Sequence, residues 1–353
     1  MQIFLYLCAM KKIFVIIWAF ISLFCASCKH STPASMVSDH ARYFAISDSL
    51  GSTCLTVYSP TDTSHILATY TIPQPYTRLA VTSATHIGLL DALQSLDKVV
   101  AMTTPEWVYN HPQQPVIYIG EDLNLNLEQL FLAHPQALLI TSYGQPLPNL
   151  DRIREAGIEV IQMVEWQEQT PLARAEWIKF VGALVGKQDL AQQVYDQVSE
   201  RYHHLIRSWD DAPLVLSGAA FRGTWYVPSG GTYMGRLFCD AGAGYPYYDD
   251  LRQSSIPLSL ESVIHDFGNA EAWVGANARS YEELATIDSH HTWFKAYQNH
   301  RVFNWYKQST PSGSNNFWER GIVHPDEILE DLITILRGEA SDTTKLHFAA
   351  PLH

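Results

Sequence analysis

Aromatic and cationic side chains gather in the segments that should connect strands to helices. Tyrosine and tryptophan offer large rigid faces with a polar handle, which suits a planar or macrocyclic ligand. Arginine and lysine in the same segments could pair with carboxylates or catecholates of such a ligand. Core packing explains any single aromatic residue equally well, so the prediction of a binding cleft depends on their clustering. The aromatic candidates are Trp107, Tyr109, Tyr143, Trp225, Tyr226, Trp305 and Trp318, and the cationic ones are Arg222, Lys307 and Arg320.

A short polar segment, Ser83 to His86, follows the first strand of an α/β pattern. Ser83, Thr85 and His86 join the ligand-binding candidates, with Thr85 expected to cap a helix that begins at His86. A histidine at this place could also ligate zinc or manganese, which makes a free-metal receptor an alternative. The other ligands are not evident at matching spacing, and the adjacent His290 and His291 would point to different sides of a helix. No metal site is therefore predicted.

The sequence contains no recognisable catalytic motif. Gly-x-Ser-x-Gly, His-Glu-x-x-His and a glycine-rich phosphate loop are all missing. We therefore expect a binding protein that is not an enzyme and uses no cofactor, with an exported hydrolase as the weaker alternative. A net charge of -13 argues against a nucleic-acid partner, because nothing would neutralise phosphates. At 353 residues and 47% hydrophobic composition, the chain is long enough for two domains.

The first 28 residues have the features of an export signal. A lysine pair precedes an apolar run at residues 13–24, which is short for a membrane span. The small residues before Cys28 resemble the lipobox of bacterial lipoproteins, in which the cysteine is acylated. We therefore expect a periplasmic protein anchored to a membrane by lipid on Cys28. An uncleaved anchor is the alternative, and the start codon (Met1 or Met10) and the choice of inner or outer membrane stay open.

Two further cysteines, Cys54 and Cys239, have no CxxC spacing and no histidine cluster nearby. They are interpreted as buried thiols rather than metal ligands. An exported location permits a disulfide between them, but the sequence does not indicate one.

Residues 170–209 predict the helical element around which the chain is organised. Thr170 should cap a helix with Pro171 at its first position, and Gly186 should end that helix. A second helix follows, with one apolar stripe at three- and four-residue spacing. About twenty helical residues span roughly 30 Å, the width of a small domain. The element is therefore expected to join two lobes, although an ordinary core helix is the alternative. The stripe consists of Leu190, Val194, Val198, Tyr202, Leu205, Ile206 and Trp209.

Alternating strand and helix patterns lie on both sides of this helical element. Apolar runs at residues 79–82, 136–141 and 158–162 precede it, and runs at residues 213–216 and 272–274 follow it. Such alternation forms mainly parallel sheets covered on both faces. The predicted fold class is therefore α/β, with two α/β lobes of mainly parallel sheets joined by a single long rigid helix.

One helical pattern occurs once in each half of the chain. An Asn or Ser cap is followed by a helix with a glutamate in its first turn, Glu128 in one half and Glu261 in the other. A glutamate there interacts favourably with the helix dipole, which explains both residues without any function.

From about residue 78 to residue 337, the sequence resembles the periplasmic binding proteins of ABC importers for ferric siderophores, haem and cobalamin. An ordered set of segments carries the resemblance, and no single motif does. The segments are Ser83-Ala84-Thr85-His86, the Leu-Asn-Leu-Glu helix before His134-Pro135-Gln136-Ala137, Ala156-Gly157-Ile158, the helical element, Trp225 to Gly231, and Trp318-Glu319-Arg320 to Pro325-Asp326.

The resemblance implies a class III binding protein that holds its ligand between two lobes. It implies a monomer that carries an iron chelate, haem or cobalamin and works with an ABC permease and its ATPase. Glu128 and Glu261 occupy what look like the positions of the family's docking glutamates, which meet arginines of the permease. Loops at the carboxyl ends of the strands should form the ligand site.

The expected domain organisation follows from these features. It comprises a lipoprotein signal (residues 1–28), a tether with an N-terminal β hairpin or meander (29–77), a first α/β lobe (78–170), the helical linker (171–210), a second α/β lobe (211–338) and a frayed tail (339–353).

Overall fold

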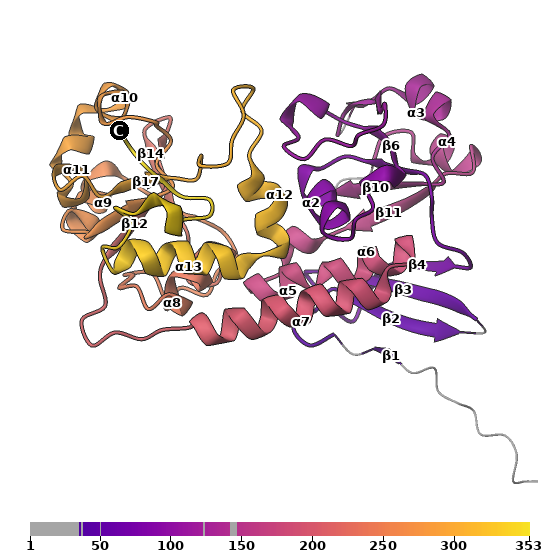
Figure 1. Ribbon diagram of the computed structural model, residues 1–353, viewed down its shortest axis with the longest axis horizontal. Coiled ribbons are helices and arrows are strands. Elements are labelled where there is room, and N and C mark those ends of the chain that lie inside the picture. The colour runs from indigo at the N-terminus through magenta and orange to yellow at the C-terminus, as the bar shows by residue number, and fades with distance from the viewer. Residues whose placement is uncertain (1–34, 37, 50, 123, 142–146) are drawn as a thin grey trace, which may run out of the picture.

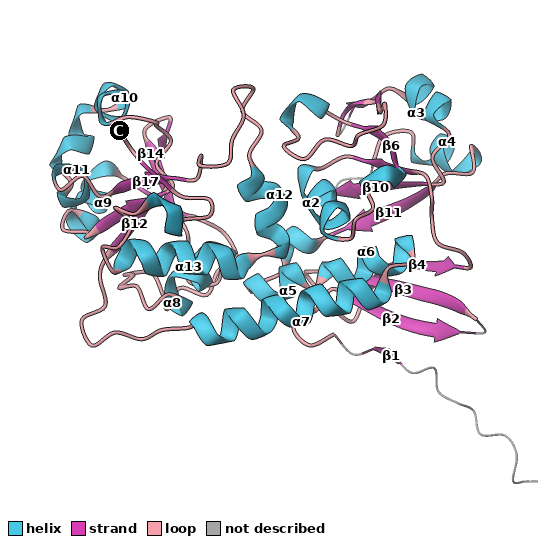
Figure 2. Cartoon of the chain, viewed as in Figure 1, coloured by secondary structure: helices cyan, strands magenta, loops and turns pink. Residues whose placement is uncertain are grey.

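The computed structural model describes residues 35–36, 38–49, 51–122, 124–141 and 147–353, and it shows two α/β lobes side by side (Figure 1; Figure 2). The expected lipidation site Cys28 and the ligand candidate Tyr143 lie outside the described residues. Within the described part, no helix has the length and apolar character needed to span a membrane.

The first lobe contains a five-stranded, all-parallel sheet of order β11-β10-β5-β6-β7. Its strands are apolar at consecutive positions because helices cover both faces: Leu79 and Val81 pack in one buried cluster, and Ala80 packs in another. The strands are β5 (Leu79–Val81), β6 (Val99–Met102), β7 (Ile117–Tyr118), β10 (Ala137–Thr141) and β11 (Glu159–Met163), with a short β8 (Gly120–Glu121) and β9 (Asn124–Leu125) pair; the helices are α2 (Ala84–Ala92), α3 (Leu127–Ala133) and α4 (Leu150–Glu155).

The second lobe repeats this plan on a smaller sheet of order β12-β16-β17-β18, in which the last strand is antiparallel. A separate antiparallel sheet, β13-β14-β15, packs beside it. The strands are β12 (Val215–Ser217), β13 (Ala220–Phe221), β14 (Thr224–Val227), β15 (Ile256–Leu258), β16 (Ala272–Val274), β17 (Val302–Asn304) and β18 (Ala350–Pro351); the helices are α8 (Tyr233–Asp240), α9 (Leu260–Phe267), α10 (Tyr281–Ile287), α11 (Lys295–Gln298) and α13 (Pro325–Leu336).

The helical element between the lobes consists of α5 (Pro171–Ala175), α6 (Trp177–Val185) and α7 (Gln188–Leu205). Thr170 caps α5 by accepting a hydrogen bond from the N–H of Ala173, and Gly186 ends α6 with a positive φ of 72°. Helix α7 contributes to both cores, since its first half packs in the first and its second half packs in the second. The predicted fold class, two α/β lobes joined by a long helix, is confirmed.

The N-terminal strands form a four-stranded antiparallel sheet that is fastened to the helical element. The carboxylate of Glu176 accepts hydrogen bonds from the backbone N–H groups of residues 39–41 at 2.7–2.8 Å. Glu168 accepts bonds from residues 42 and 43 at 3.0–3.2 Å. Two buried carboxylates therefore replace the strand partners that this segment lacks. The strands are β1 (Ser35–Met36), β2 (Phe44–Ser49), β3 (Ser52–Tyr58) and β4 (Ile66–Ile72).

Helix α12 (Asn316–Val323) belongs to the second lobe in sequence but packs on the first lobe. Ile322 and Val323 lie in the core of the first lobe. The Glu319 carboxylate accepts hydrogen bonds from the backbone N–H groups of Tyr109 and Asn110, and the bond from Asn110 is 2.9 Å long. The expected assignment of residues 211–338 to one lobe therefore differs from the structure, because α12 crosses between the lobes.

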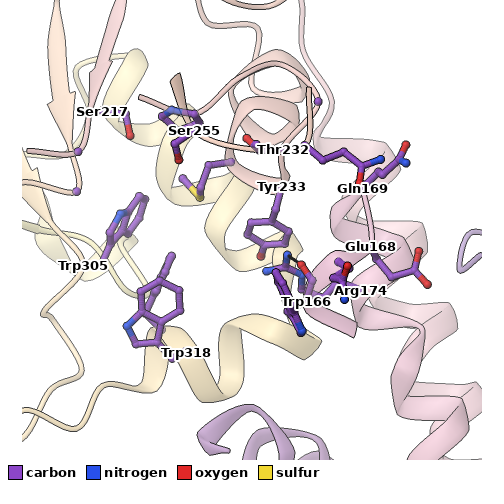
Figure 3. A pocket seen from close by; sticks show the side chains of 18 residues that line it. Trp166, Glu168, Gln169, Arg174, Ser217, Thr232, Tyr233, Ser255, Trp305 and Trp318 are labelled. Carbon is purple, nitrogen blue, oxygen red and sulfur yellow. Dashed lines mark hydrogen bonds between the residues drawn. The ribbon is translucent and has the colours of Figure 1, made fainter. Parts of the chain in front are cut away.

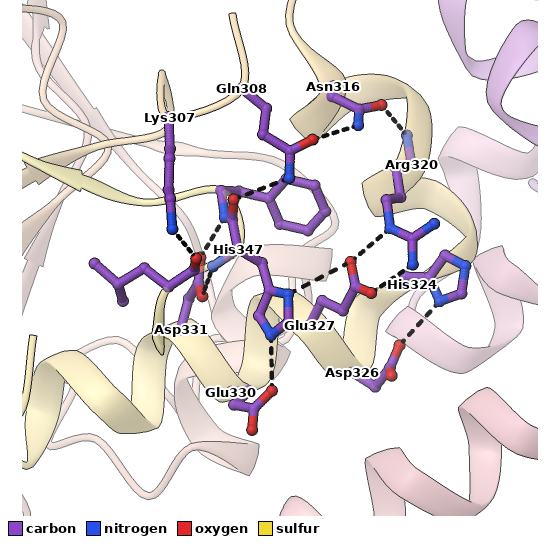
Figure 4. Close-up of polar contacts among 12 residues, drawn as sticks. Lys307, Gln308, Asn316, Arg320, His324, Asp326, Glu327, Glu330, Asp331 and His347 are labelled. Atoms are coloured by element: carbon purple, nitrogen blue, oxygen red, sulfur yellow. Dashed lines mark hydrogen bonds and ion pairs between the residues drawn. The ribbon is translucent and has the colours of Figure 1, made fainter. Parts of the chain in front are cut away.

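The C-terminal residues are ordered, so the expectation of a frayed tail over residues 339–353 is wrong. The buried carboxylate of Asp331 accepts hydrogen bonds from three consecutive backbone N–H groups, those of residues 347–349, at 2.6–2.8 Å. His347 also bonds to Glu330 (Figure 4). These contacts guide the chain into β18, which completes the second sheet.

Cys54 and Cys239 are both free thiols. Cys54 lies on β3 in the N-terminal sheet, and Cys239 lies on α8 in the second lobe. Each side chain is half-buried, so the prediction of buried thiols is only partly met.

Candidate ligand-binding site

A cavity of about 560 Å³ lies between the helical element and the second lobe. Its floor includes the residues directly after β12 and β16, which are the carboxyl ends of parallel strands. This is where open α/β sheets bind their ligands. The lining residues are Trp166, Gln167, Glu168, Gln169, Arg174, Ser217, Gly218, Pro228, Gly231, Thr232, Tyr233, Met234, Gln253, Ser255, Gly275, Trp305, Phe317 and Trp318.

Aromatic rings form much of the cavity wall (Figure 3). Trp305 stacks on Phe317, with ring centroids 4.8 Å apart and planes 19° from parallel. Trp318 projects from α12 and keeps 61% of its surface exposed. Trp166, from η3 (Glu165–Gln167), and Tyr233, from α8, lie across from these rings in the close-up. Such a surface suits the face of a flat ligand.

Arg174 is the cation of this cavity, and the sequence did not suggest it. Its Nη2 donates to the backbone carbonyl of Trp166 at 2.5 Å, and its guanidinium carbon lies 4.3 Å from the ring centroid of Tyr233. Burial lowers the pKa of Arg174, because the charged form loses solvation. In the sequence, Arg174 falls within the predicted linker helix, and nothing in its sequence environment marks it as facing a cavity.

A smaller recess of about 40 Å³ adjoins the cavity, with Arg174, Trp166 and Tyr233 lining both. Thr85 and Glu165 of the first lobe line only the recess. The Thr85 hydroxyl donates to Glu165 Oε1 at 2.9 Å. Burial raises the pKa of the Glu165 carboxyl.

The structure brings three of the predicted ligand-binding residues together at this site. Trp305 and Trp318 line the cavity, and Thr85 lines the recess. Ser83 lies beside them and caps α2, a role that was expected of Thr85. Its hydroxyl also lies 2.8 Å from the hydroxyl of Thr85.

Two other candidates, Trp107 and Tyr109, lie where the first lobe meets α12 and the loop before it. Gly313 in that loop is so close to Trp107 that an added Cβ would lie 2.8 Å from its ring. The backbone N–H of Tyr109 donates to Glu319. Both residues therefore contact the crossing segment, and neither lines the cavity.

The assignment of Trp225 and Tyr226 to a ligand loop is wrong. They lie on strand β14, where successive side chains point to opposite faces. Trp225 is therefore buried against Trp273 and donates its Nε1–H to the carbonyl of Ser217, while Tyr226 faces solvent outside the cavity.

The three predicted cations also lie outside the cavity. Arg222 is exposed in the turn between β13 and β14, with its guanidinium beside the ring of Phe221. Lys307 donates to backbone carbonyls of the C-terminal segment. Arg320 forms a two-point ion pair with Glu327 (Figure 4).

The assignment of His86 to the ligand site is wrong as well. His86 is fully buried in the first lobe, and neither ring nitrogen has a hydrogen-bond partner among the described residues. His291 is also fully buried, with Nδ1 bonded to the carbonyl of Leu284. The described residues contain no group of three or more His, Cys, Asp or Glu side chains that could hold a metal ion.

The buried His86 predicts a pH effect on stability. Burial lowers the pKa of His86 to about 3, whereas in the unfolded chain it keeps its ordinary value near 6.5. Its contribution to stability is therefore fully present above pH 6.5 and is lost as the pH falls toward 3. Between pH 7 and pH 5 this loss amounts to about 2 kcal/mol.

We expect His86→Leu to remove that part of the pH dependence, as measured by urea unfolding at pH 7 and pH 5. The exposed His65 supplies a control, because His65→Leu should leave the pH dependence unchanged. An equal pH dependence in wild type and His86→Leu would show that His86 is not buried as a neutral ring.

The paired glutamates lie in equivalent positions of their helices. Asn126 caps α3 and Ser259 caps α9, and each cap is followed two residues later by an exposed glutamate, Glu128 or Glu261. The two helices belong to different lobes (Figure 1). The predicted caps are confirmed.

Comparison with known proteins agrees with this architecture. The fold is similar to the periplasmic haem-binding protein HutB of Vibrio cholerae, with a TM-score of 0.56, 18% identity, and coverage of 72% of this chain and 98% of that one. It is also similar to the periplasmic vitamin B12-binding protein BtuF of Vibrio cholerae, with a TM-score of 0.54, 15% identity, and coverage of 76% and 99%.

Sequence comparison gives a relative and a family. An uncharacterised lipoprotein of Methanocaldococcus jannaschii is 24% identical over 292 residues, which cover 78% of this chain and 68% of that protein. Residues 79–309 match the family described as periplasmic binding protein. The chain therefore belongs to the periplasmic binding protein family.

Proposed function

We propose that this protein is the substrate-binding component of an ABC importer and carries a metal chelate, such as haem, cobalamin or an iron–siderophore complex. The observation that supports this most is the aromatic cavity between the helical element and the second lobe. HutB and BtuF, which share the fold, bind haem and vitamin B12. Binding and delivery require no catalytic group.

The free-metal alternative has less support. It depends on His86 as a ligand, and His86 is buried away from the cavity. The cavity wall instead offers aromatic faces and one guanidinium, which suit an organic ligand better than a bare cation.

We propose that Cys28 carries the lipid that holds the protein at the membrane. The support is the lipobox-like segment before Cys28 and the similarity to a lipoprotein. The mass of the N-terminal peptide of the mature protein tests this, since acylation adds several hundred daltons or more to a peptide that begins at Cys28. An unmodified Cys28 in the mature protein would contradict it.

We propose that Glu128 and Glu261 dock the protein on arginines of the permease. Both carboxylates are exposed, and each follows the cap of its helix by two residues. Charge pairs at such an interface set register and association rate more than affinity.

Trp318→Ala is expected to weaken ligand binding by about 2 kcal/mol, roughly thirtyfold in Kd, because its ring forms an accessible part of the cavity wall. The measurement is quenching of tryptophan fluorescence during titration with haemin, cyanocobalamin or a ferric siderophore. Trp293→Ala is the matched control: Trp293 is 60% exposed but does not line the cavity. If both variants bind as wild type does, the ligand site lies elsewhere.

A further inference from the structure

Two side chains that line the recess each keep a buried polar atom without a hydrogen-bond partner among the described residues. The atoms are Nε of Arg174, a donor, and Oε2 of Glu165, an acceptor when the carboxyl is ionised. A buried donor or acceptor left unpaired destabilises the folded protein. A ligand group that satisfies both atoms would therefore gain from each of them.

Other atoms of both groups are held by the protein, which limits what the recess can accept. Glu165 is 1% exposed, and its Oε1 accepts a hydrogen bond from the Thr85 hydroxyl. Arg174 Nη2 donates to the Trp166 carbonyl, and the guanidinium carbon lies over the Tyr233 ring, 4.3 Å from its centroid. The structure records no ion pair between Arg174 and Glu165 within the described part of the chain, so the two groups do not satisfy each other.

A carboxamide presents an acceptor and donors on two separate atoms, whereas a hydroxyl carries both on one oxygen. A carboxylate offers acceptors only, and an ammonium offers donors only. The recess volume, about 40 Å³, suits a small polar group rather than a ring, since about 10–15 Å³ on this measure holds one water. The ring system of such a ligand would then occupy the adjoining cavity.

The charges around the recess also disfavour a carboxylate. Glu165 and Glu168 both lie close enough to Arg174 to affect its ionisation, so the guanidinium is already partly balanced. An additional anion would meet these two carboxyl groups in a protein of net charge -13. A neutral amide brings no charge to the recess.

We infer that the recess formed by Thr85, Glu165, Arg174 and Tyr233 binds a carboxamide at the edge of a planar macrocyclic ligand, with the carbonyl toward Arg174 and the N–H toward Glu165. The inference rests on the proposed function, because it assigns the ring of the same ligand to the aromatic cavity. It makes Glu165 a residue that selects amide-bearing over carboxylate-bearing ligands.

The test compares two corrins that share a ring. Dicyanocobinamide carries amide side chains, and dicyanocobyrinic acid carries carboxylates in their place. By isothermal titration at pH 8, the wild-type protein is expected to bind dicyanocobinamide at least about tenfold more tightly. Glu165→Gln should bring this ratio close to one, because the glutamine amide can donate to a carboxylate.

Arg222→Gln is the matched control, since Arg222 is exposed outside the cavity and its removal should leave the ratio unchanged. A structural effect of Glu165→Gln would weaken both corrins equally, so the ratio separates recognition from folding. Equal or tighter binding of dicyanocobyrinic acid by wild type would overturn the inference. Binding of haemin or a ferric siderophore but of neither corrin would also overturn it, yet would leave the proposed function standing. Failure of all these ligands to bind would contradict both.

Discussion

Gly88→Ala is expected to lower the free energy of unfolding by about 3 kcal/mol, at the upper end of overpacking effects. Helix α2 of the first lobe approaches the crossing helix α12 at this glycine. A Cβ on Gly88 would lie 2.1 Å from the carbonyl oxygen of Glu319, and backbone atoms cannot move aside as a flexible side chain can. The two helices would have to separate, which would also shift the cavity wall formed by Phe317 and Trp318.

Chemical denaturation of purified Gly88→Ala measures this effect. Gly321→Ala is the matched control, because Gly321 lies on the same helix α12 and its nearest neighbour is the flexible end of Ile328, at 3.0 Å. The control should lose much less stability. A loss below about 1 kcal/mol for Gly88→Ala would show that α2 and α12 are not in close backbone contact.

The double variant Glu128→Ala/Glu261→Ala is expected to reduce ligand uptake more than tenfold while ligand affinity stays unchanged. Both carboxylates are exposed and absent from the cavity lining, so their loss would remove the two proposed permease contacts without changing the ligand site. Loss of charge pairs slows the association of the two proteins and fixes their relative orientation less strictly. The measurement is transport into vesicles that contain the permease and its ATPase, alongside titration of the ligand.

Glu282→Ala is the matched control for helix effects. Glu282 is exposed and follows the capping Ser280 of α10 by two residues, the same spacing that Glu261 has from Ser259. It should transport as wild type does. Normal uptake by the double variant would mean that Glu128 and Glu261 interact only with their helix dipoles. Loss of ligand affinity would mean that the ligand site has been assigned to the wrong face of the protein.

The fold class could be predicted because helix caps and apolar strand runs are local patterns that are easily recognised in the sequence. Caps such as Thr170, Asn126 and Ser259 act within one turn of helix, and apolar strand runs report burial on both faces. The path of α12 could not be predicted in this way. It depends on a close approach between Gly88 and Glu319, which are far apart in the sequence, and no local pattern encodes that contact.

The site was predicted less well than the fold, for two physical reasons. Trp225 and Tyr226 were assigned to a loop, although Thr224 to Val227 is a run of strand-forming residues whose alternation sends Trp225 inward. Arg174 was missed because a cavity between lobes brings together residues from several elements. Its role depends on the ring of Tyr233 from the second lobe, and only the folded chain shows that contact.

Native mass spectrometry of the protein purified from the cells that produce it tests the proposed ligand most directly. We predict one small organic ligand per chain, with the mass of a metal complex, and we predict that Trp318→Ala lowers its occupancy while Trp293→Ala does not. A chain that carries only a bare metal ion, or a ligand whose occupancy is unaffected by Trp318→Ala, would contradict the assignment of the aromatic cavity as the site of a transported chelate.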